Sequence, residues 1–175
     1  MVRCAVGVEV GTYRGDFAEQ ILKDTNVAQL FCVDPWKKQE NYNDTINLED
    51  QEAHYQETHR KLHKFIRTNQ CVIVRNFSAP VAKEGVIRDL DFAFIDAYHA
   101  YEAALEDITL WSKRLKPTGV LFAHDYFEGP SYGHDGHVWY SGVVKACADF
   151  CKEYGWEVTG ISAEALPTAK LERIK

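Results

Sequence analysis

The sequence predicts a single α/β domain, residues 1–175, with a doubly wound, mostly parallel sheet of six to seven strands and helices on both faces. Short apolar runs rich in β-branched residues recur along the chain, and segments with helical spacing of apolar residues separate them. Nearly continuous apolar strands are typical of a parallel sheet that is covered on both faces, since a strand with one wet face alternates apolar and polar residues. The length suits one domain with one buried core.

The expected strands are the apolar runs themselves. They cover residues 4–10, 28–33, 71–74, 91–95, 119–123 and 156–161. The last stretch, 167–175, alternates weakly and predicts a final strand.

Helices are expected between these strands, at 16–24, 50–68, 101–115 and 139–154. In the first of them Asp16 takes the amino-terminal cap position, and Phe17, Ile21 and Leu22 form the apolar face. Gly155 directly follows the last helix and predicts its end, because a glycine readily adopts the left-handed conformation found there.

Two segments, 36–49 and 126–138, are polar or contain glycine, and each directly follows a strand. They should therefore lie over the carboxyl ends of the sheet, where open α/β domains bind ligands. We expect them to be substrate loops. His134 and His137 of the second loop are expected to be exposed, with contact to a substrate as the alternative.

Composition excludes several classes of partner. The formal net charge of -6 and the small, scattered basic clusters argue against nucleic acid, which requires a stripe of Lys and Arg. The amino end carries neither a signal peptide nor an apolar run long enough to span a membrane, so we expect a cytoplasmic protein without a membrane partner. The odd number of cysteines, several in apolar runs, predicts reduced thiols.

The first strand ends in the turn "VGVEVGTYRGDF". The dinucleotide pattern G-x-G-x-x-G would need a glycine where Tyr13 stands, which disfavours NAD. Glu9, Gly11 and Gly15 remain as an acid at the strand end, a glycine that lets backbone approach a ligand, and the amino end of a helix.

Asp34 ends the second strand in "FCVDPW" and should lie beside that turn. A carboxylate in this place can accept two hydrogen bonds from a ribose diol, which indicates a nucleoside ligand. The alternative is that Gly11 is only a turn residue and that Asp34 only caps the segment after it.

Two later strands each end in an acid and an imidazole. "FIDAYHAYE" carries Asp96 and His99, and "GVLFAHDY" carries His124 and Asp125. Because neighbouring parallel strands end at the same edge, we expect these side chains to form one site. Each residue taken singly has an alternative role: Asp96 as the cap of the next helix, His99 as a helix-start residue, His124 as a support for a neighbouring ligand, and Asp125 as an anchor of the loop after it.

The stretches "VEVGTYRG", "VDPW" and "FIDAYHAYEAALEDITLWSKRLKPTGVLFAHDY" resemble the class I S-adenosylmethionine-dependent methyltransferases. They are most similar to the metal-dependent branch of sugar and macrolide O-methyltransferases, which carries an I-D-G-x-H-type motif and a later acid pair or H-D. The resemblance spans about residue 5 to residue 161.

This resemblance implies a role for each residue. The methionine part of the cofactor would face Glu9 and Gly11, the ribose Asp34, and the adenine Trp36, Phe77 and Ser78. The full cofactor-binding set that it implies is Glu9, Gly11, Tyr13, Gly15, Asp34, Trp36, Phe77, Ser78 and Asp96.

The resemblance also implies a divalent cation on Asp96, His124 and Asp125, commonly Mg²⁺, with Asp96 and His99 as the catalytic pair and His99 as general base. Ala97 and Tyr98 depart from the motif, where the family has a turn glycine and an acid. One nitrogen ligand suits Mg²⁺ less well, so Mn²⁺, iron or zinc stay open.

The amino-terminal helices that often cover the substrate in relatives are not expected, so the two loops or a partner subunit in a homo-oligomer would close the pocket. We therefore expect a methyltransferase that modifies a hydroxyl of a small molecule such as a sugar or a sugar-bearing metabolite. The alternatives are a metal-dependent hydrolase or hydroxylase-like protein of the same fold, and a non-catalytic nucleoside-binding domain or oligomer scaffold.

Overall fold

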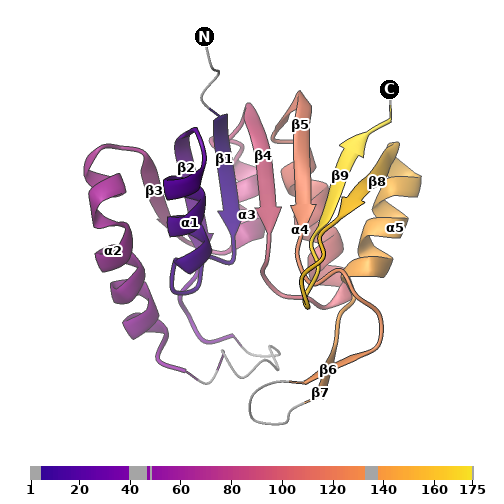
Figure 1. Cartoon of the computed structure of the whole chain (residues 1–175), viewed down its shortest axis with the longest axis horizontal. Helices are drawn as coiled ribbons and strands as arrows, with labels where there is room; N and C mark the ends of the chain where they lie inside the picture. The colour runs from indigo at the N-terminus through magenta and orange to yellow at the C-terminus, as the bar shows by residue number, and fades with distance from the viewer. Residues whose placement is uncertain (1–4, 40–46, 48, 133–137, 175) are drawn as a thin grey trace.

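The structure is a computed structural model that describes residues 5–39, 47, 49–132 and 138–174 (Figure 1). The strands are β1 (Ala5–Val10), β2 (Val27–Asp34), β3 (Cys71–Arg75), β4 (Leu90–Ile95), β5 (Leu115–Ala123), β6 (Pro130–Tyr132), β7 (Val138–Tyr140), β8 (Trp156–Ile161) and β9 (Ala169–Arg173). The helices are α1 (Asp16–Asp24), α2 (Gln51–Arg67), α3 (Ser78–Glu84), α4 (Tyr101–Ser112) and α5 (Val143–Tyr154).

Seven of the strands form one sheet in the order β3-β2-β1-β4-β5-β9-β8, and β6 pairs with β7 in a small second sheet. The pairs β1·β2, β1·β4, β2·β3 and β4·β5 are parallel, whereas β9 runs antiparallel to β5 and β8. The predicted doubly wound, mostly parallel sheet and its final strand are therefore confirmed. The chain order reverses between β1 and β4, which is where open α/β sheets form a ligand crevice.

Helices cover the two faces of the sheet unequally (Figure 1). One face packs against α3, α4 and α5, and its core includes Val8 and Val10 of β1 together with Trp111 of α4 and Phe150 of α5. The other face packs against α1 and α2 mainly over β1, β2 and β3, with Phe92 of β4 at the edge of that cluster. The sheet thus has one covered face and one face that is covered in part.

Several boundaries differ from the prediction. The cap of α1 is Gly15, with a φ of 76°, and Asp16 is the first helical residue. Helix α4 ends at Ser112 because Leu115 already pairs with Leu90 of β4. Helix α3 was not predicted.

The hairpin β6–β7 lies in the region predicted as a loop and delays the start of α5 to Val143. Gly155 ends α5 with a φ of 69°, as predicted. Among the described residues, no helix combines the length and the apolar character that crossing a bilayer requires.

Candidate active site

A cavity of about 300 Å³ lies at the carboxyl ends of the parallel strands, at the point where the chain order reverses. Gly11 after β1, Asp34 at the end of β2 and Asp96 after β4 line it, together with residues of α3 and α4. Three of the segments that the sequence singles out therefore meet around one space.

Gly11 allows the loops after β1 and β4 to touch. Its φ is +90°, and a Cβ atom at this position would lie 1.8 Å from the backbone oxygen of Asp96. Any other residue would therefore force the two loops apart, because the obstacle is backbone and cannot swing away. Gly11 is required for this contact whether or not a ligand is bound.

The Asp34 carboxylate connects two turns. Its Oδ2 accepts a hydrogen bond from the backbone N–H of Tyr13 at 2.9 Å, and its Oδ1 accepts one from the N–H of Trp36 at 2.7 Å. Burial raises the pKa of Asp34, and these two hydrogen bonds oppose the rise. The capping role considered as an alternative is present, and Asp34 also lines the cavity, so the same carboxylate retains lone pairs toward it.

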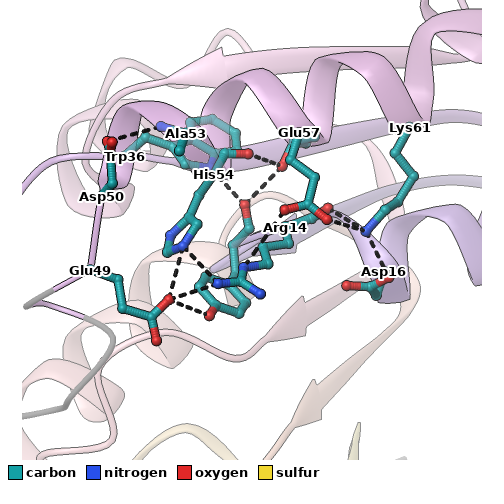
Figure 2. A network of polar contacts seen from close by, with 11 residues as sticks. Arg14, Asp16, Trp36, Glu49, Asp50, Ala53, His54, Glu57 and Lys61 are labelled. Atoms are coloured by element: carbon teal, nitrogen blue, oxygen red, sulfur yellow. Dashed lines mark hydrogen bonds and ion pairs between the residues drawn. The ribbon is translucent and has the colours of Figure 1, made fainter.

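The turn after β1 is fastened to α2 by the charged network in Figure 2. Arg14 lies between Glu49, at 2.9 Å, and Glu57, at 3.8 Å, and Glu49 also contacts the imidazole of the buried His54. The hydroxyl of Tyr13 donates to the same carboxylate of Glu49 at 3.0 Å. Protein contacts therefore fix the turn in the shape that places Gly11 and Tyr13 at the cavity.

Two residues predicted to contact the cofactor, Trp36 and Gly15, do not line the cavity. Trp36 is 2% exposed, and its indole Nε1 donates to the backbone oxygen of Tyr13 at 2.7 Å. Gly15 packs against α2, where an added Cβ would lie 3.0 Å from Thr58 Cγ2. The positions of Trp36 and Gly15 are structural and do not support the predicted contact with a cofactor.

Glu9 lies below the turn, in the core of the sheet rather than in the cavity wall. It is 2% exposed, and its Oε2 has no hydrogen-bond partner. Burial, reinforced by the negative charges of Asp96 and Asp34, holds the pKa of Glu9 well above its ordinary value, although a hydrogen bond with Thr12 lowers it. Burial thus opposes ionisation of Glu9, whose side chain does not line the cavity, and its role at the cofactor stays a prediction.

Phe77 and Ser78 line the cavity next to α4, as predicted, and Phe77 is 39% exposed. The hydroxyl of Ser78 donates to Asp107 Oδ1 at 2.5 Å and accepts from Trp111 Nε1 at 2.8 Å, so it already has partners. Burial raises the pKa of Asp107 to about 6. Sequence reasoning missed Asp107, although an acid between Ala104 and Trp111 on an apolar helix stripe was a visible signal.

The side chains of Asp96, His124 and Asp125 converge at the ends of β4 and β5. One ligand atom of each lies within 4.8 Å of the others, a spacing that would hold a metal ion. His124 Nδ1 is 3.2 Å from Asp96 Oδ1 and 3.4 Å from Asp125 Oδ2. Burial alone would lower the pKa of His124, but the two carboxylates raise it to about 10. The predicted convergence of these three residues is confirmed.

Asp125 is held in an unusual backbone conformation, with a φ of 57° and an exposure of 3%. Its Oδ2 lies 3.0 Å from His99 Nδ1, and its Oδ1 is buried without a partner. Burial opposes ionisation here, yet His124 and His99 outweigh it and hold the pKa of Asp125 below its ordinary range. A buried carboxylate oxygen without a partner fits a donor set that awaits a cation.

His99 joins this group to the cavity. It lines the 300 Å³ cavity through the loop before α4, and its ring lies 5.2 Å from that of Trp139 in β7. His134 and His137, as well as most of the loop 36–49, lie outside the described residues.

A family model described as a methyltransferase domain matches residues 8–126, which is more than half of the chain. The chain belongs to this methyltransferase family. It is therefore an S-adenosylmethionine-dependent methyltransferase, as the motifs implied.

The fold of this methyltransferase is shared with solved structures at low sequence identity. The pyocyanin biosynthetic protein PhzM matches with a TM-score of 0.70 and 13% identity over 98% of this chain and 51% of its own. The mitomycin 7-O-methyltransferase MmcR matches with a TM-score of 0.66 and 13% identity over 98% and 49%. This chain spans about half the length of these two proteins.

The TrmK protein of M. capricolum, in complex with S-adenosyl-homocysteine, matches this methyltransferase with a TM-score of 0.64 and 10% identity over 99% of this chain and 64% of its own. No curated protein matches the chain.

Proposed function

We propose that the protein transfers the methyl group of S-adenosylmethionine to a hydroxyl oxygen of a small molecule, with the help of a divalent cation. The observation that supports this most directly is the convergence of Asp96, His124 and Asp125 beside the cavity that Gly11 and Asp34 line. Methyl donor, nucleophile and proton acceptor would then meet in one place.

The cavity fits the donor. Asp34 is a half-buried carboxylate at the end of β2 with lone pairs toward the cavity, which suits the diol of a ribose. Phe77 offers an aromatic face in the same wall, which suits adenine. The wall formed by Gly11 and Asp96 is where the methionine part would lie.

The donor set Asp96, His124 and Asp125 fits a divalent cation, since it combines two carboxylates with an imidazole and leaves Asp125 Oδ1 without a protein partner. A cation held there would lower the pKa of a bound hydroxyl. The nitrogen ligand leaves Mn²⁺, iron and zinc open beside Mg²⁺.

The transfer itself is an in-line displacement. The hydroxyl oxygen of the acceptor forms a bond to the methyl carbon, while the bond between that carbon and the sulfonium sulfur breaks and its electron pair returns to sulfur, which leaves neutral S-adenosylhomocysteine. Alignment of the two reactants is the main contribution of the protein, and such alignment is worth about 7 to 11 kcal/mol.

His99 is placed to take the hydroxyl proton. With a proton on Nδ1, which faces Asp125 Oδ2 at 3.0 Å, the His99 ring would carry its lone pair on Nε2. Nε2 would accept the proton, and the carboxylate of Asp125 would stabilise the imidazolium that forms.

The acceptor in this proposal is a small molecule and not a nucleic acid. The net charge is -6, and the basic clusters in the sequence are small and scattered. Neither feature suits a surface that pairs with the phosphates of a nucleic acid. A homo-oligomer that closes the pocket stays part of the proposal.

Calorimetric titration with S-adenosylmethionine and S-adenosylhomocysteine, with and without Mn²⁺, tests the proposal. We expect Asp34→Ala to weaken binding of both ligands about tenfold, because a charge-assisted pair is lost. We expect Asp125→Ala to spare that binding and to abolish cation-dependent methyl transfer.

Equal cofactor affinity in Asp34→Ala and the wild type would contradict the ribose assignment. Cation binding without any cofactor binding would favour the metal-dependent hydrolase, and no binding of either would favour a non-catalytic domain.

A further inference from the structure

The partly covered face of the sheet carries a second, larger cavity of about 980 Å³. Helices α1 and α2 lie over β1, β2 and β3, α1 reaches the edge of β4 through Phe17, and among the described residues no helix lies over β5 and β9 on that side (Figure 1). The cavity extends along these strands from Ala5 and Val27 at one end of the sheet to Asp96 and His124 at the other.

Aromatic side chains form the floor of this cavity. Phe94 of β4 pairs with Phe122 of β5, so both rings lie on the same face of neighbouring strands. Phe92 lies nearer the amino end of β4, and its ring covers Gly7, where an added Cβ would lie 2.1 Å from the ring. Phe17 of α1 closes one side, with its ring 4.3 Å from that of Phe94.

The wall of the cavity formed by β8 and β9 has few side chains around Gly160. Lys170 of β9 pairs with Phe122 and with Gly160 of β8. A Cβ atom added at Gly160 would meet only Lys170 Cβ, at 3.9 Å. Lys170 is ion-paired with Glu172 at 3.0 Å, so its charge does not call for an anionic ligand.

One end of the cavity is polar and is shared with the candidate active site. Asp96 lines both cavities, and His124 of the candidate cation site lines the larger one. A molecule that lies on the aromatic floor would thus place its end at Asp96, opposite the donor. This continuity distinguishes the cavity from an isolated apolar patch.

We infer that this face of the sheet is the acceptor site, and that it takes a small molecule with a flat apolar body and a hydroxyl at one end. The volume matches ligand sites, which typically measure about 300–1,000 Å³ and combine apolar walls with a few polar groups. The rings of Phe92, Phe94 and Phe122 would stack on the body, and Asp96 and His124 would receive the hydroxyl. Methylation of that hydroxyl rests on the proposed function, whereas binding of the molecule to this face does not.

Fluorescence titration with 2-naphthol, a flat apolar phenol, tests the site. Gly160→Leu would fill the cavity from its open side, and Ile161→Asp would add a charge where Ile161, 58% exposed, lines it. Val86→Asp is the matched control, because Val86 is 81% exposed and does not line the cavity.

We expect saturable binding by the wild type and Val86→Asp, and affinity at least about tenfold weaker in Gly160→Leu and Ile161→Asp, because a bulky or charged group displaces an apolar ligand. Absence of saturable binding to the wild type, or equal affinity in all the variants, would overturn the inference. So would a wild-type dimer that Ile161→Asp converts to a monomer without any naphthol binding, because a second copy would then occupy the face.

Titration of the same variants with S-adenosylmethionine separates this inference from the proposed function. We expect unchanged cofactor affinity in Gly160→Leu and Ile161→Asp, because neither residue lines the smaller cavity. If the protein binds naphthol but not S-adenosylmethionine, the proposed function is refuted and the inferred binding site on this face still stands. Cofactor binding without naphthol binding would refute only the acceptor site.

Discussion

The two faces of the sheet are built from the same strands, yet they differ in how far helices cover them. On the face toward α3, α4 and α5, buried side chains form one cluster that runs from Val81 of α3 to Trp156 of β8. On the face toward α1 and α2, the buried cluster includes Leu30 and Cys71 but does not reach β5. Successive side chains of a strand point to opposite faces of the sheet. A strand with one covered face and one open face can therefore supply core residues on the first face and a binding surface on the second.

Strand β4 shows this division between adjacent residues. Ala93 is fully buried in the cluster that α4 covers, whereas Phe94 points to the other face and lines the larger cavity. The small residue lies under α4, and the large ring lies between Phe17 of α1 and the larger cavity. The aromatic rings on this face therefore contact α1 on one side and form the cavity wall on the other.

Trp111→Ala should test the covered face with the largest effect. The side chain is fully buried in α4, and its indole donates to Ser78, so truncation leaves a cavity and removes one of the two hydrogen bonds of the Ser78 hydroxyl. We expect a loss of about 3–5 kcal/mol in the free energy of unfolding. Chemical denaturation monitored by circular dichroism measures it, and a loss below about 1 kcal/mol would contradict the role of this face as the main core.

Asp107→Asn should sharpen the comparison through pH, since Asp107 is an ionisable group inside the covered face. Its pKa in the folded chain is about 6, above its ordinary value of 3.8, so between these values the folded state binds more protons and stability falls as pH rises. The asparagine oxygen can still accept from Ser78, so we expect the variant to be more stable than the wild type by about 2–3 kcal/mol at pH 8.

At pH 4, where the wild-type carboxyl is largely protonated, the advantage of Asp107→Asn should nearly vanish. Thermal unfolding across this range is the measurement, with the wild type as the paired control. A difference in melting temperature that does not change with pH would show that Asp107 carries its charge at no cost.

Phe122→Ala should have the smallest effect on stability, because its ring is only partly buried and faces the larger cavity. We expect a loss of about 1 kcal/mol or less, well below the loss for an enclosed aromatic residue. The denaturation experiment used for Trp111→Ala applies here, with Phe150→Ala as the matched aromatic control from the covered face. Equal losses for Phe122→Ala and Phe150→Ala would remove the distinction between the two faces.

Much of the fold follows from the sequence because the parallel strands are nearly continuous apolar runs. The strand at 156–161 begins and ends where the pattern predicts. Helix α3 was missed because it has seven residues, with Pro80 in its first turn, too few for a periodic stripe. Helix α4 was predicted too long because Leu115 continues its apolar spacing although it belongs to β5.

The candidate site divides in the same way. Asp96, His124 and Asp125 could be brought together from the sequence because neighbouring parallel strands end at one edge. Trp36 could not be placed, because no residue pattern reports its φ of 39°, and its indole donates to the backbone of Tyr13 instead of lining the cavity. The partly open face also had no sequence signal, since it depends on which strands the helices cover.

The contact between Gly11 and the carbonyl of Asp96 limits how this enzyme can diversify. Substitutions at that contact would disturb the loops after β1 and β4 together, so both loops are expected to change slowly in related chains. Phe122 and Ile161, at a distance from that contact, are free to vary in size and polarity. If this face of the sheet is the acceptor site that we infer, new acceptors would arise by changes in its aromatic residues, while the loops after β1 and β4 stay unchanged.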